Sequence, residues 1–302
     1  MTLHRLTAIT VGVPDVAATA AYYADFGLTP AAGHRLATSA GGEQLRLVRT
    51  PTRRLVELGI GTDDPDDLAR TAGRLARLGH TAHRDDDALT AVDPGTAVRI
   101  RLTVAPRIPG VEAAARTAPV PRVDARAPAV LRTAPVRPRK LGHVVLGSTD
   151  HERSTVFFTD GIGFRVSDRV PGIAAFLRCS TDHHNVLVQP APVPYLHHTS
   201  WEVGDIDEIG RGATRMLEGH PERHVWGLGR HHIGSNFFWY LRDPAGNFSE
   251  YYSDLDCIVD DALWRPEDFS DLRALYSWGP PVPPSFLEPG DLAALMTGAH
   301  TA

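Results

Sequence analysis

The side chains best suited to chemistry lie in one aromatic stretch of the second half of the chain, residues 229–252. This stretch contains His231, Tyr240 and Glu250, and its middle, residues 236–241, has the apolar and aromatic composition of a buried strand. A carboxylate among so many aromatic rings needs a partner, because burying it unpaired costs several kcal/mol or shifts its pKa. With histidines nearby, we predict that Glu250 binds a metal ion. This stretch alone leaves open the alternative that Glu250 lies at an exposed edge and only adds solubility.

The elements that position these residues form a hairpin. Residues 243–246, Asp-Pro-Ala-Gly, have the order typical of a type I turn, with Pro at the second position and Gly at the fourth. We therefore expect strand 236–241 to be followed by an antiparallel strand over 247–252 that carries Glu250.

Length and composition limit the function classes. The chain has 302 residues, 42% apolar and 22% charged, which favours a soluble globular protein of about two domains. Its net charge is −5 and it has no basic run, so we expect no nucleic-acid partner. Cys179 and Cys257 form no motif and suit a reducing cytosol. No signal-peptide pattern or long apolar segment is present, so we expect a cytoplasmic protein without a membrane partner.

The chain contains an internal repeat. Residues 141–150 align with residues 6–15 at an offset of 135, and a strand followed by a helix is expected at both places. In the first copy, helices are predicted over 16–26 and 66–78, each opened by Asp and Pro and closed by Gly. Each half is predicted to be a pair of βαβββ units, so the expected fold class is α+β with two tandem domains.

The segments outside the repeat have a different composition. Residues 105–139 are rich in Pro, Ala and Arg without a period, which predicts a semi-extended linker between a domain over 1–104 and a domain over 140–302. The tail after residue 254 is expected to carry short helical pieces at 259–263 and 270–275. Its proline-aromatic end is predicted either to cover the site as a lid or to seal the edge of a sheet.

The repeat provides an internal control for metal ligands. Three residues of the second half that can bind a metal align with residues of the first half that cannot: His143 aligns with Ala8, His198 with Leu55, and Glu250 with Arg99. Two imidazoles and one carboxylate from separate strands match the facial triad of non-haem Fe(II) sites, which leaves positions open for substrate and oxygen. Zinc more often has a thiolate or a third histidine, and magnesium more oxygens. We therefore predict one Fe(II) per chain, with Mn(II) as the alternative, bound by the second half only.

The second half resembles the vicinal oxygen chelate superfamily, specifically the two-domain type I extradiol ring-cleavage dioxygenases of the 2,3-dihydroxybiphenyl 1,2-dioxygenase type. The resemblance is carried by Leu141-Gly142-His143-Val144-Val145, by His183-His184, by His198-Thr199-Ser200-Trp201-Glu202-Val203, and by the hairpin of residues 229–252. It implies tandem vicinal oxygen chelate modules that cleave a catechol-type diol with O2, and it places the metal ligands on His143, His198 and Glu250. Members of this family commonly assemble, which implies a homo-oligomer.

The resemblance also implies roles for three further residues. His184 would be the catalytic acid–base group, and His231 and Tyr240 would contact the substrate oxygens. The family often has an acidic residue three positions after the histidine that corresponds to His231, where this chain has Gly234. Because neighbouring strand residues face opposite sides, only one histidine of each adjacent pair is expected to point inward. We therefore predict that His183 points away from the site.

Two other functions are compatible with the pattern. One is another enzyme of the superfamily, either a glyoxalase-like isomerase or a relative of 4-hydroxyphenylpyruvate dioxygenase. The other is a metal-free binding protein of the same fold, which would not need an inward triad together with His184, His231 and Tyr240. The particular catechol cannot be predicted from the sequence.

Overall fold

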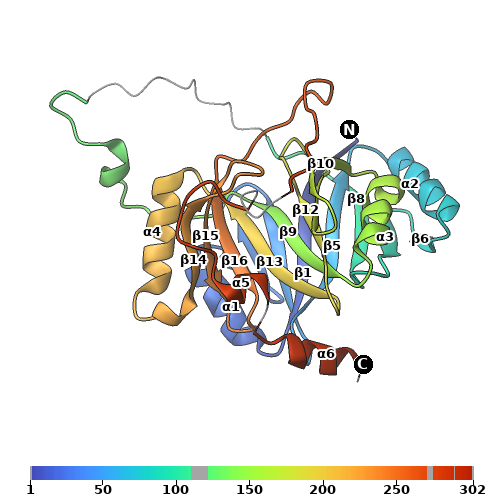
Figure 1. The fold of residues 1–302 in the computed structure, drawn as a ribbon, viewed down its shortest axis with the longest axis horizontal. Helices are drawn as coiled ribbons and strands as arrows, with labels where there is room; N and C mark the ends of the chain where they lie inside the picture. Colours follow the sequence, from blue (N-terminus) through green and yellow to red (C-terminus); the bar gives the residue numbers. More distant parts are fainter. Residues whose placement is uncertain (1, 110–121, 271–274, 289, 301–302) are drawn as a thin grey trace.

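The computed structural model describes residues 2–109, 122–270, 275–288 and 290–300. It contains two eight-stranded mixed sheets that lie against each other at the centre of the molecule (Figure 1). Both sheets have the same topology, with the order β2-β3-β4-β1-β5-β8-β7-β6 in the first and β10-β11-β12-β9-β13-β16-β15-β14 in the second. Each sheet thus joins two βαβββ units through its central strands, which confirms the predicted α+β class and its repeat.

The first sheet comprises β1 (Leu3–Val13), β2 (Thr29–Ala31), β3 (Arg35–Thr38), β4 (Gly42–Arg49), β5 (Arg54–Thr62), β6 (Ala82–Arg84), β7 (Ala88–Val92) and β8 (Arg99–Val104). The second comprises β9 (Lys140–Ser148), β10 (Arg165–Val170), β11 (Ala174–Arg178), β12 (Val186–Pro190), β13 (Tyr195–Glu202), β14 (His224–Arg230), β15 (Phe237–Arg242) and β16 (Phe248–Ser253).

The main helices begin at capping aspartates, as their sequences predict. Asp15 accepts a hydrogen bond from the backbone of α1 (Val16–Asp25), and Asp64 forms a capping box with Asp67 at the start of α2 (Pro65–Arg77). In the second half, α3 (His151–Val156) continues into a π-helix, η2 (Phe157–Ile162), and α4 (Ile206–Leu217) covers β15 and β16. Short 3-10 helices η1 (Pro128–Leu131) and η3 (Pro221–Arg223) lie in connections.

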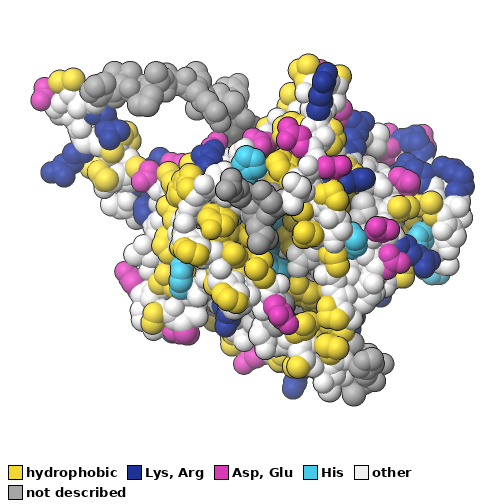
Figure 2. All heavy atoms as spheres, in the orientation of Figure 1, with side chains coloured by type: hydrophobic (Ala, Val, Ile, Leu, Met, Phe, Trp, Pro, Cys, Tyr) yellow, Lys and Arg dark blue, Asp and Glu magenta, His cyan; other side chains and the backbone are white. Residues whose placement is uncertain are grey.

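One hydrophobic core joins the two halves. It extends from Leu6 and Val11 in the first sheet to Val144 and Trp201 in the second. Phe26, the C-cap residue of α1, stacks its ring on that of Tyr251 with centroids 3.8 Å apart. On the face shown in Figure 2, hydrophobic side chains gather over the centre of the molecule and basic side chains lie mostly toward its periphery. No helix among the described residues is both long and apolar enough to cross a bilayer.

The tail differs in part from its prediction. The expected helical piece at 259–263 is wrong: residues 261–263 form only a turn, in which Asp260 accepts a hydrogen bond from the backbone of Ala262. The piece expected at 270–275 falls mostly outside the described residues. The tail helices that the structure does contain are α5 (Pro284–Leu287) and α6 (Leu292–His300), and the tail crosses the second sheet before it ends (Figure 1).

Candidate metal centre and active-site cavity

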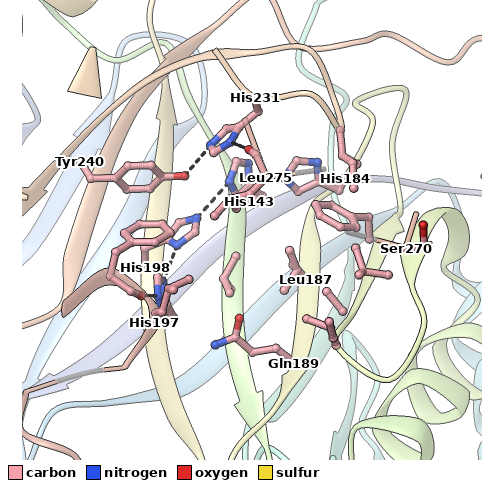
Figure 3. A pocket seen from close by; sticks show the side chains of 18 residues that line it. His143, His184, Leu187, Gln189, His197, His198, His231, Tyr240, Ser270 and Leu275 are labelled. Carbon is pink, nitrogen blue, oxygen red and sulfur yellow. Dashed lines mark hydrogen bonds between the residues drawn. The ribbon is translucent and has the colours of Figure 1, made fainter. Parts of the chain in front are cut away.

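Three buried side chains converge from adjacent strands at the centre of the second sheet. His143 lies on β9, His198 on β13 and Glu250 on β16, and one ligand atom of each lies within 4.8 Å of the others. Glu250 Oε2 is 3.1 Å from His143 Nε2 and 3.6 Å from His198 Nε2, and the two Nε2 atoms are 3.4 Å apart. The structure therefore brings together the three residues that the sequence pattern selected (Figure 3 shows the two histidines).

The environment of Glu250 fits a divalent cation. Its side chain is completely buried, and Oε1 accepts a hydrogen bond from Asn236 at 3.1 Å, whereas Oε2 accepts none from the residues that the structure describes. A buried carboxylate oxygen without a donor is costly unless a cation neutralises it. Two nitrogen ligands and one carboxylate on one side of a site also match the donor set of non-haem Fe(II).

Strand pairing corrects the repeat alignment on which the triad was inferred. In the second sheet, Ser200 pairs with both His143 and Glu250, and His198 lies two residues before Ser200. In the first sheet, Gly59 pairs with both Ala8 and Arg101. The equivalents of His198 and Glu250 are therefore Glu57 and Arg101, and the predicted partners Leu55 and Arg99 were wrong by two residues. The first sheet thus places one alanine, one carboxylate and one arginine at the triad positions.

His184 faces the cavity beside the triad, and its ring centroid lies 4.2 Å from that of His143. His183 does not line the cavity, in agreement with its prediction, but it is hydrogen-bonded to His184. The two Nδ1 atoms are 3.1 Å apart, and His183 Nε2 is 2.8 Å from Asp168 Oδ2. Strand alternation does not explain this orientation, because residues 179–185 form a loop between β11 and β12, in which side chains do not alternate.

His197 and His198 both line the cavity. This contradicts the expectation that only one of them points inward, and the cause is a β-bulge. The pairing of β13 with β9 shifts between Leu196 and His198, so His197 has no opposite residue and its side chain is free to turn inward. Burial lowers the pKa of His197 to about 4, and it lowers the pKa of His198 well below its usual value.

His231 and Tyr240 form a hydrogen-bonded pair at the edge of the cavity (Figure 3). His231 Nδ1 donates to the backbone oxygen of Leu275 at 2.5 Å, so in neutral His231 the Nε2 atom accepts from the Tyr240 hydroxyl at 2.9 Å. Burial lowers the pKa of His231, and burial together with the Glu250 charge raises the pKa of Tyr240 well above its usual value. Tyr240 therefore keeps its proton and acts as a donor.

Above the triad lies a cavity of about 310 Å³, a size suited to one small organic molecule. Apart from the histidines, its lining is mainly apolar and includes residues that sequence reasoning missed: Val145, Phe176, Leu187, Leu275, Phe286 and Leu287. Phe286 and Leu287 come from the tail. Its proline-aromatic composition predicted that the tail packs over another part of the protein, but it did not indicate which part. The tail takes both predicted roles, because Phe286 and Leu287 line the cavity while Asp268 and Trp278 form bridges with Arg169 and Arg230 on the two edge strands, β10 and β14.

The fold and the site agree with comparisons to known proteins. The sequence model of the Glyoxalase/Bleomycin resistance protein/Dioxygenase superfamily matches residues 140–251. Metapyrocatechase 2 of Cupriavidus necator is 31% identical over 298 residues, which cover 94% of this chain and 92% of the relative. The chain belongs to the vicinal oxygen chelate superfamily, in its extradiol dioxygenase branch. This confirms the family that the motifs indicated.

Two further members of the superfamily bear on the metal. The iron-dependent extradiol dioxygenase of Rhodococcus jostii is 35% identical over 154 residues, which cover 46% of this chain and 50% of the relative. The Mn(II)-bound glyoxalase of Novosphingobium aromaticivorans has a solved structure that covers 94% of each chain with a TM-score of 0.75 and 25% identity. One of these relatives is iron-dependent and the other is bound to Mn(II) in its structure, the two metals expected here.

Proposed function

We propose that this chain opens a catechol ring next to its hydroxyl groups, with O2 as co-substrate, at a metal bound by His143, His198 and Glu250. The single observation that carries the proposal is the buried, incompletely hydrogen-bonded triad at the floor of an apolar cavity. In the reaction the carbon–carbon bond beside the diol breaks and both atoms of O2 enter the product. An Fe(II) or Mn(II) ion held there would supply Lewis acidity toward the catechol oxygens and the redox capacity to activate O2.

The hydrogen bonds around His184 suit it to accept a proton. Since the carboxylate of Asp168 only accepts, His183 Nε2 carries a hydrogen and donates it, which leaves His183 Nδ1 as an acceptor. His184 Nδ1 then donates to His183, and His184 Nε2 has a free lone pair. Burial, followed by the neighbouring histidines, lowers the pKa of His184 well below its usual value, so the residue is neutral before it takes up a proton. We assign His184 the transfer of the catechol proton.

His231 and Tyr240 would orient the diol. Their hydrogen-bonded pair lies beside the triad, with His231 Nε2 3.8 Å from Glu250 Oε1. Both side chains line the cavity, so a ring bound above the metal would have these polar groups on one side and His184 on another. Buried polar groups of this kind position a diol and discriminate against analogues that lack one hydroxyl.

The cavity lining favours a catechol with an uncharged, apolar substituent. Among the described side chains that line it, Lys, Arg, Asp and Glu are absent, and the polar ones other than histidine and tyrosine are Gln189 and Ser270. A carboxylate on the substrate would lose its hydration without gaining a cationic partner among these described side chains, which is costly. We infer that alkyl- or aryl-substituted catechols bind better than carboxylated ones.

The direct test is reconstitution with Fe(II) or Mn(II) under anaerobic conditions, followed by exposure to O2 with a panel of catechols. We expect absorbance from a yellow ring-opened product, with higher kcat/KM for apolar substituents than for carboxylated ones. An enzyme that binds metal but opens no catechol would favour an isomerase, in line with its similarity to a Mn(II)-bound glyoxalase. If the protein binds no metal, both the dioxygenase function and the isomerase function are excluded.

A further inference from the structure

A backbone group of the C-terminal tail is hydrogen-bonded into the metal centre. The carbonyl oxygen of Phe286 lies 2.6 Å from His197 Nε2, and His197 Nδ1 lies 2.8 Å from His198 Nδ1. Phe286 is almost completely buried, and its ring packs against Phe248 and Tyr240, with centroids 5.9 and 4.6 Å away. The tail is therefore part of the wall behind the metal centre.

The direction of these hydrogen bonds follows from one fact: a carbonyl oxygen only accepts. His197 Nε2 must then carry a hydrogen, which leaves His197 Nδ1 as the acceptor in the neutral ring. His198 Nδ1 is the donor to that atom, and His198 Nε2 is left without a hydrogen. Nε2 is the atom that faces His143 and Glu250, and a metal ligand must be unprotonated there.

We propose that His197 is a positioning residue that couples docking of the C-terminal tail to metal affinity, by fixing the tautomer and ring orientation of His198. The inference rests on the metal site proposed above. The Phe286 carbonyl acts on His198 only through His197, and it sets the tautomer of this ligand before the metal binds.

A second contact shows what holds the tail in place. Arg53, in the connection between β4 and β5 of the first sheet, forms a two-pronged ion pair with Asp291, with nitrogen–oxygen distances of 2.6 and 2.9 Å. Its remaining Nη1 donates to the backbone oxygen of Leu196 at 2.5 Å. Arg53 is 4% exposed, so this guanidinium is a buried junction.

Leu196 links the Arg53–Asp291 ion pair to the metal-ligand strand. Leu196 directly precedes His197 and lies at the edge of the bulge that turns His197 inward. One arginine from the half without the metal therefore contacts both the tail and the strand that carries the ligand. Such contacts behind a ligand typically change metal affinity by about 10- to 100-fold when removed.

The test measures metal affinity in the full-length protein, with Co(II) as a spectroscopic probe and Fe(II) under anaerobic conditions. His197→Phe keeps the ring volume but removes both nitrogens, and we expect its metal Kd to rise about 10- to 100-fold and the Co(II) spectrum to change. Asp291→Ala releases the tail at a half-exposed residue and should raise the Kd by up to about tenfold. Glu288→Ala is the matched control, because it removes the same charge from an exposed position of the same tail.

The double variant decides whether the tail acts through His197. If it does, His197→Phe with Asp291→Ala should bind metal as weakly as His197→Phe alone, because the two changes break one chain of contacts. Unchanged affinity in a folded His197→Phe variant, or additive losses in the double variant, would overturn the proposal. If His197→Phe does not fold, an Asp291→Ala variant that binds metal like the wild type overturns it equally. Absence of metal binding by the wild type would instead contradict the proposed metal site itself.

Discussion

Replacing His183 by phenylalanine tests the proton-transfer assignment most directly, because His183 touches neither the cavity nor the triad. His183 is completely buried between Asp168 and His184. The substitution keeps a ring of similar size and removes the acceptor for His184 Nδ1. His184 is then free to carry its hydrogen on Nε2, the atom that should accept a proton from the substrate.

The size of the effect follows from the hydrogen bond that is lost. When His184 takes up a proton it becomes a cation, and a hydrogen bond to a charged group is worth about 1.5–3 kcal/mol. Losing this amount in the transition state corresponds to a decrease in kcat of about 10- to 150-fold. The decrease should be smaller than for His184→Phe, which removes the proton acceptor itself and should cost about 10²- to 10⁴-fold.

The assay is single-turnover ring opening by protein loaded anaerobically with Fe(II), together with the metal content and KM of each variant. His183→Phe should keep metal and KM, since neither depends on the His184 tautomer. Asp168→Asn should lower kcat less than His183→Phe, because an amide oxygen can still accept from His183. Turnover of His183→Phe at the wild-type rate would refute the proposed relay, and loss of metal in that variant would show that His183 supports the triad instead.

Three further predictions follow from the site. Glu250→Ala should lose stoichiometric iron, measured by metal analysis, while the circular dichroism spectrum stays that of the folded protein; full metal occupancy would contradict the ligand assignment. Ile173→Arg adds a cation at the exposed mouth of the cavity. An ion pair with the substrate worth about 1 kcal/mol should raise the kcat/KM for carboxylated catechols, relative to that for apolar catechols, about fivefold. An unchanged ratio of the two kcat/KM values would contradict the specificity argument. The metal-free protein should lose stability as the pH falls from about 6.5 to 4, since the pKa of His197 is about 4 in the fold and 6.5 when unfolded, so the unfolded chain binds more protons in this window. This shift corresponds to about 3 kcal/mol, and Asp243, whose pKa burial raises to about 6, opposes it by about the same amount. Burial also lowers the pKa of His184, His198 and His231, which decides the direction; a melting temperature that rises on acidification would refute it.

Most of the fold was predictable because its signals are local. Asp15 and Asp64 cap the first turns of their helices and so mark the helix starts in the sequence. The Asp-Pro-Ala-Gly sequence forms the expected turn, in which Asp243 accepts hydrogen bonds from the backbone of Ala245 and Asn247. The triad was predictable for a different reason: histidines and a buried glutamate on three strands have few other uses. The register of the repeat was not, because bulges change which residues lie opposite one another.

The missing parts of the site depend on contacts between distant segments. The prediction for His183 used the alternation of a strand, but the chain forms a loop there, and its partner Asp168 lies on β10. Phe286 reaches the cavity 89 residues after His197, its hydrogen-bond partner. No local pattern reports such a contact, so the tail could be predicted to cover something without its target being known.

The half of the chain without the triad also supports the metal strands from behind. Within a strand, neighbouring side chains face opposite sides of the sheet. Thr199 and Ser249, each next to a triad residue, therefore face away from the cavity, toward α1 of the first half. There the Tyr22 hydroxyl is 2.6 Å from Ser249 Oγ and the Tyr23 hydroxyl is 3.3 Å from Thr199 Oγ1. Helix α1 therefore contacts β13 and β16 directly beside the proposed metal ligands His198 and Glu250, and these contacts fix the spacing of the two strands. The first half thus contributes to the geometry of the site while it carries none of the three converging side chains.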